Sequence, residues 1–124
     1  MPNLLAGSFP AYFQNYINLM EADSVAEAIG KYSGGMVPFF KSIPLQKIDY
    51  RYADGKWSIK ELLQHVIDAE RIFAYRALTI ARGDKTPLPG FDEGKYVAAS
   101  NASGRSWDSL LQEFEAVRKS TDLL

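Results

Sequence analysis

His65 is the only histidine in the 124-residue chain, and it lies inside a long, largely apolar run that follows Ser58. Imidazole nitrogen binds zinc, nickel, iron or copper, and a catalytic metal usually takes three protein ligands and a water molecule. One histidine cannot build such a centre alone. The spacing by itself therefore favours a packing histidine at the edge of the core over a metal ligand.

Of the charged residues that share this run with His65, three are candidates for a role in chemistry. Glu70 projects into the apolar arc, where an ionised carboxylate is costly unless it is paired or ligating. We expect an ion pair with an arginine of a neighbouring helix or subunit ahead of a role in catalysis or coordination. Asp68 could orient the imidazole, although its projection is nearer solvent. Arg76 fits a dimer contact as well as a substrate pocket.

The run that carries these residues is predicted to be one long helix. Ser58 and Glu61 form the S-x-x-E pattern of a reciprocal N-terminal cap, and Gly83 is a plausible C-terminal stop. At about 100° per residue the apolar residues make two adjacent stripes, an arc too broad for a helix that packs on one side only. One stripe contains Leu62, Val66, Ala69, Phe73, Ala77 and Ile80, and the other contains Leu63, Ile67, Ala74, Leu78 and Ala81.

Further helices are expected before and after this one in the sequence. An earlier helix is predicted to begin after a cap at Asp23 or Ser24. The last helix begins near Ser106 and continues to Leu124 with no stop signal. The segment 83–96 contains too much glycine and proline to continue the long helix. No segment has the alternation of a strand, so we expect an all-α fold, organised as a single domain over residues 1–124.

Composition excludes several classes of function. The net charge is −1 and lysine and arginine do not cluster, so nucleic acid is not an expected partner. The chain has no cysteine, which excludes thiolate metal sites and is compatible with the reducing cytoplasm, the expected location. No apolar segment approaches the ~18 residues of a membrane span. Phosphate-binding loops, the G-x-S-x-G elbow and the H-E-x-x-H motif are also missing from the sequence.

The segment 57–84, WSIKELLQHVIDAERIFAYRALTIARGD, followed by TPLPGFDE at 86–93, resembles the DinB-like superfamily of bacterial four-helix proteins, over about residues 49–117. The resemblance implies an up-down-down-up four-helix bundle and frequent homodimerisation. It also implies a metal-dependent hydrolase or thiol-transferase site for a small-molecule substrate that the sequence does not identify. In that family a histidine matching His65 joins an H-x-x-x-H pair of the last helix around a divalent metal, usually zinc or nickel.

The chain departs from the family pattern at the metal site. It contains no H-x-x-x-H, and it ends where the last helix would follow, so we expect a bundle that lacks this helix and an incomplete metal site, or none, in this chain. Truncation of a longer protein is favoured over a natural variant without the histidine pair. Two functions remain open: a metal-dependent enzyme with His65 as one ligand, and a metal-free helical dimerisation module.

Overall fold

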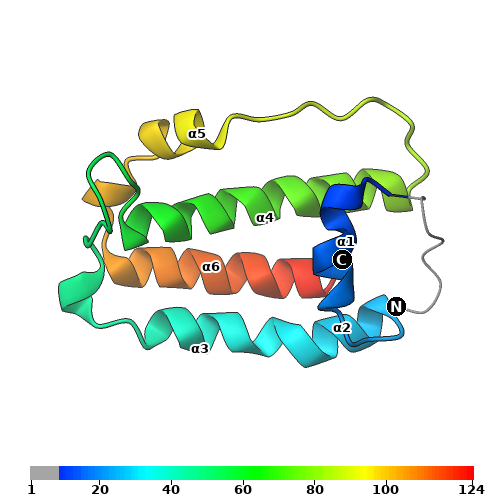
Figure 1. Ribbon diagram of the computed structural model, residues 1–124, viewed down its shortest axis with the longest axis horizontal. Coiled ribbons are helices and arrows are strands. Elements are labelled where there is room, and N and C mark those ends of the chain that lie inside the picture. Colours follow the sequence, from blue (N-terminus) through cyan, green and yellow to red (C-terminus); the bar gives the residue numbers. More distant parts are fainter. Residues whose placement is uncertain (1–8) are drawn as a thin grey trace. The chain divides into compact units, whose positions relative to one another are not determined.

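The computed structural model describes residues 9–124, which contain helices and loops and no strand (Figure 1). The predicted all-α class is therefore confirmed. The chain divides into two compact units, residues 1–36 and residues 37–124. Whether they act as one domain stays a prediction, and each unit is described by itself.

The first unit is built from short helices. Ser24 caps α2 by accepting a hydrogen bond from the backbone N–H of Glu27, and the Glu27 carboxylate accepts one from the N–H of Asp23. Of the two predicted caps, Asp23 and Ser24, the structure uses Ser24. The helix gives way to a 3-10 turn at Gly34 and Gly35. The elements are η1 (Ala11–Phe13), α1 (Gln14–Asn18), α2 (Val25–Tyr32) and η2 (Ser33–Gly35).

The second unit contains the long helices. Figure 1 shows α4 and α6 side by side and running in the same direction, with α3 running in the opposite direction. This is the up-down-down order expected for the first three helices of a DinB-like bundle. The elements are α3 (Met36–Lys41), η3 (Leu45–Lys47), α4 (Ile59–Ala81), α5 (Glu93–Ala99), η4 (Ala102–Gly104) and α6 (Trp107–Asp122).

The ends of α4 are where the sequence predicts them. The Ser58 hydroxyl accepts a hydrogen bond from the N–H of Glu61, and the Glu61 carboxylate accepts one from the N–H of Ser58 at 2.7 Å. At the other end Gly83 has a positive φ of 73°, and the N–H groups of Gly83 and Asp84 donate to the carbonyls of Ile80 and Thr79. This is the Schellman arrangement that ends a helix at glycine.

The core of the second unit lies between α4 and α6. Leu63 and Ile67 of α4 and Leu110 of α6 are fully buried, and Phe114 is nearly so. Burying each such side chain contributes about 1.5–3 kcal/mol. The ring of Phe40, from α3, packs edge-on against Phe114 with 5.2 Å between centroids. The stripe of α4 with Leu63 and Ile67 supplies the buried residues, and the other stripe contributes only the partly buried Val66.

Helix α5 was not predicted. Asp92 caps it by accepting a hydrogen bond from the N–H of Lys95 at 3.0 Å, and Val97 is buried. The helix is only seven residues long, and Gly94 and the prolines before it hide its pattern. Within residues 9–124, no helix combines the length and the hydrophobicity needed to cross a bilayer.

Candidate functional site

A groove of about 470 Å³ runs along the stripe of α4 that contains Val66, Ala69 and Phe73, and it reaches the end of α6. Its wall is mostly apolar, with one imidazole and one carboxylate that faces a guanidinium. The residues that line it are His65, Val66, Ala69, Glu70, Phe73, Ala74 and Ala77 of α4, and Arg118 and Thr121 of α6. The helical repeat of three and four residues brings the α4 members to one side, so His65 and Glu70 share a surface.

The His65 side chain is half-buried in the wall of this groove. Its ring lies against that of Trp57, with 4.9 Å between the centroids and 42° between the planes. Among residues 9–124, neither ring nitrogen has a hydrogen-bond partner. The position therefore agrees with the predicted boundary between core and solvent, and Trp57 limits the orientations that the imidazole can adopt.

The described residues do not fit a complete metal centre. Within residues 9–124, no group of three or more histidine, cysteine, aspartate or glutamate side chains is close enough to hold an ion. The carboxylate nearest in the groove, Glu70, is engaged by a guanidinium, which competes with a cation. Since a catalytic metal needs about three protein ligands, His65 would require donors from outside these residues.

Glu70 has the arginine partner that the sequence predicts. The guanidinium of Arg118 on α6 donates to the Glu70 carboxylate at 2.8 Å and to Asp122 at 3.0 Å. The Glu70 side chain is only 11% exposed. The Glu70 carboxylate and the Arg118 guanidinium are both largely buried, so they stabilise the fold only as a pair. Either charge alone would be desolvated without compensation. The ion pair therefore joins α4 to α6 at the floor of the groove.

Asp68 and Arg76 do not line the groove. The Asp68 carboxylate accepts a hydrogen bond from Gln64 at 3.0 Å and faces a separate depression near Arg105. Arg76 donates to the carbonyl of Pro89 at 2.8 Å and lies between the rings of Phe73 and Phe91. Arg76 thus fastens the proline-rich loop to α4, and Asp68 belongs to a polar cluster on another side of the helix.

That polar cluster was missed by reasoning from the sequence. Arg105 donates to the Gln64 side chain at 2.8 Å and to Glu113, which also receives a hydrogen bond from Arg71 at 3.0 Å. Burial of the Glu113 carboxyl opposes its ionisation, but the two arginines outweigh this and lower the pKa of Glu113. The hydrogen-bonded pairs of this cluster are up to 42 positions apart in the sequence, so helical spacing gives no signal for them.

Trp57 and Arg118 were likewise not singled out. Trp57 precedes the cap of α4, so no helical repeat relates it to His65. Arg118 has the polar position expected of an exposed residue in α6. Only the approach of α6 to α4 brings its guanidinium to Glu70.

The comparisons with known proteins agree with the fold. The sequence model of the DinB superfamily matches residues 35–124, which include α3, α4, α5 and α6. No curated protein and no solved structure gives a match. The matched region covers the whole second unit, with its long capped helix and the groove beside His65. The chain therefore belongs to the DinB superfamily.

Proposed function

We propose that this chain forms one side of a metal-dependent enzyme site of the DinB type, a hydrolase or a thiol-transferase. His65 is one ligand of a divalent metal, zinc or nickel. The other ligands come from outside residues 9–124, on an element that occupies the groove. The observation that carries the proposal is the place of His65, an imidazole without a hydrogen-bond partner among those residues, in the wall of that groove.

The surroundings of His65 support this role. Imidazole nitrogen is a preferred ligand for zinc and nickel, and apolar neighbours such as Val66 and Phe73 line the groove beside it. A bound divalent metal would polarise a bond or activate a water molecule or a thiol. The residues of this chain would hold the metal on one side and shape the cavity. Trp57 would fix the ring that binds it.

Metal binding by the purified chain tests the proposal. Protein without a histidine tag is titrated with Zn²⁺ and Ni²⁺ against a chromophoric chelator, and the His65→Ala and Gln112→Ala variants are compared with the parent. Gln112 is an exposed residue of α6 and serves as the control. Because this chain supplies only one of the ligands, we expect weak binding, of the order of a single imidazole, that His65→Ala abolishes and Gln112→Ala preserves. Equal binding by the parent and His65→Ala contradicts the proposal.

A second candidate function is a metal-free helical dimerisation module. The observation that favours it is the exposed stripe of α4 beside the groove, in which Phe73 is 58% and Ile80 70% exposed. Apolar side chains arranged in this way are typical of interaction surfaces. Absence of metal binding together with a stable dimer, measured by sedimentation equilibrium, would support this candidate. A homodimer is compatible with both functions, because a second copy could also cover the groove.

For the location of the protein we propose the cytoplasm. The support is the absence of cysteine from the sequence, which leaves no need for an oxidising compartment. Fractionation of cells that express the untagged protein tests this proposal. Recovery in a membrane or secreted fraction would contradict it.

A further inference from the structure

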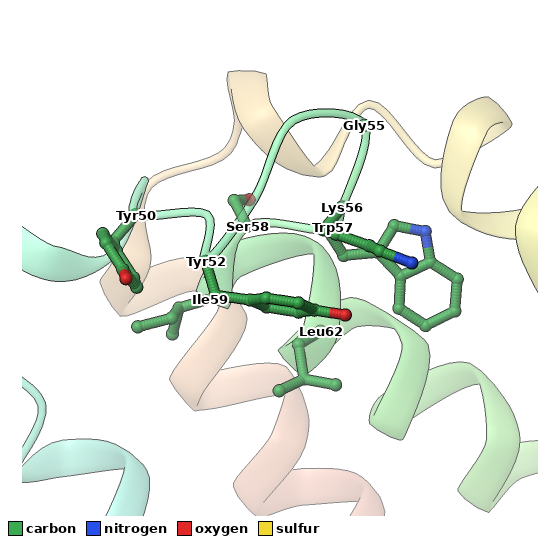
Figure 2. Close-up of a pocket in the computed structure, with 8 residues that line it drawn as sticks. All are labelled: Tyr50, Tyr52, Gly55, Lys56, Trp57, Ser58, Ile59 and Leu62. Carbon is green, nitrogen blue, oxygen red and sulfur yellow. The ribbon is translucent and has the colours of Figure 1, made fainter.

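A second cavity, of about 540 Å³, lies at the N-terminal end of α4. Figure 2 shows Tyr50 and Trp57 at opposite ends of this pocket, with Tyr52, Ile59 and Leu62 between them. The volume is within the range of small-molecule sites, about 300–1,000 Å³. The lining is chiefly aromatic and aliphatic, so the pocket suits a flat apolar group.

The loop that forms the pocket is held in place by the cap of α4. The guanidinium of Arg51 donates to the carbonyl of Lys56 at 2.5 Å and to the carboxylate of Glu61 at 2.6 Å. Gly55, which lies between Arg51 and Lys56 in the sequence, allows the turn of this loop with a φ of 72°. Arg51 thus ties the loop to the first turn of the helix, and the aromatic walls are arranged before any ligand arrives.

The charge available to a ligand in the pocket is positive. Lys56 is the charged residue that lines it, and among residues 9–124 its amine has no carboxylate partner. The nearby carboxylate of Glu61 is already engaged by Arg51 and by the N–H of Ser58. The hydroxyl groups of Tyr50 and Tyr52 also have no hydrogen-bond partner among the described residues. An amine and two hydroxyl groups around an apolar cavity suit an acidic aromatic molecule.

We propose that this pocket binds a small aromatic molecule that carries one negative charge, such as an aromatic carboxylate or sulfonate. Trp57 lines the pocket and its ring also contacts the ring of His65. Leu62 of the pocket precedes His65 by one helical turn, so the two cavities follow one another along the same side of α4. That the bound molecule is the substrate of the site at His65 rests on the proposed function.

Titration with naphthalene-2-sulfonate, followed by ¹H–¹⁵N correlation spectra of the full chain, tests the proposal. Neutral 2-naphthol and cationic 1-naphthylmethylamine are matched probes of similar size. The chain has two tryptophans, so two indole N–H signals report separately on Trp57 in the pocket and on Trp107 in the core. We expect the Trp57 signal and the amides of residues 50–62 to shift, and the sulfonate to bind tighter than both probes.

Three variants sharpen the result. Tyr52→Ala should weaken the sulfonate about fivefold to tenfold, whereas Tyr12→Ala, an equally exposed tyrosine elsewhere, should not change it. Lys56→Gln should weaken the sulfonate about twofold to fivefold and leave 2-naphthol unchanged. Both tyrosines are more than 70% exposed, so these variants should fold.

Two results would overturn the proposal. One is a set of shifts centred on the groove residues rather than on residues 50–62. The other is equal affinity of the three probes together with no effect of Lys56→Gln. Neither measurement involves a metal, so a negative outcome here is distinct from a failure of His65 to bind zinc or nickel.

Discussion

The two apolar stripes of α4 have similar composition but different surroundings. Leu63 and Ile67 are fully buried against α6, whereas Phe73 and Ile80 on the other stripe are mostly exposed. Both stripes satisfy the same helical repeat, but the tertiary structure buries only the stripe of Leu63 and Ile67, while the other stripe packs against the core only at the partly buried Val66. The stripe packed on α6 stabilises the fold, while the open stripe carries His65 and the groove. An apolar stripe therefore predicts that a helix face is buried, but it does not identify the helix or partner that buries it.

The largest expected effect is the loss of stability when a residue of the buried stripe is truncated, compared with the same change on the open stripe. Leu63→Ala leaves a cavity between α4 and α6 and should lower the free energy of unfolding by about 2–5 kcal/mol. Phe73→Ala removes a larger side chain but should change it by only about 0.5 kcal/mol, because that ring is exposed. Urea unfolding at equilibrium measures both. A loss for Phe73→Ala as large as that for Leu63→Ala would mean that the open stripe is packed in solution.

A smaller effect is expected at the ion pair that joins the two helices beside the groove. Arg118→Met leaves the Glu70 carboxylate without its closest cation and should lower the free energy of unfolding by about 1–3 kcal/mol. The double variant with Glu70→Met should recover part of this loss, because no buried charge is then left alone. A double-mutant cycle of urea unfolding gives the coupling. A coupling near zero would mean that solvent screens the pair.

The smallest effect is expected at the N-terminal cap of α4, which supports both stripes equally. The hydrogen bond from Arg51 is the main reason that the pKa of Glu61 lies below its ordinary value. Because the pKa of Glu61 is lower in the folded state, its ionised form stabilises the fold at every pH above the unfolded-state pKa, near 4.5. This stabilisation is lost as the pH falls through the folded-state pKa. Glu61→Gln should therefore cost about 0.5–1 kcal/mol at pH 7 and less at pH 3.

The same unfolding experiment at the two pH values checks this prediction. Glu115→Gln, which removes an exposed ion pair with Lys41, is the matched control and should have a smaller effect at pH 7. If the loss from Glu61→Gln is the same at pH 3 and pH 7, the carboxylate charge does not stabilise the cap.

Much of the secondary structure could be predicted, because its signals are local. The Ser58 cap with Glu61 and the glycine stop at Gly83 fix both ends of α4, and Ser106 marks the start of α6. Helix α5 was missed because its seven residues are too few to show a repeat. The site was predicted less completely. His65 lies at the expected boundary and Glu70 has the expected type of partner, but Asp68 and Arg76 lie on other surfaces.

The sequence by itself determined the helices, their caps and the resemblance to the DinB superfamily, because hydrogen bonds and side-chain repeats over three or four residues are written in neighbouring positions. Only the tertiary structure decided which stripe of α4 is core, that Arg118 neutralises Glu70, and that Trp57 stands between the pocket and His65. These contacts depend on how α6 and the loop before α4 pack, and pairings between distant residues leave no periodic signal in the chain.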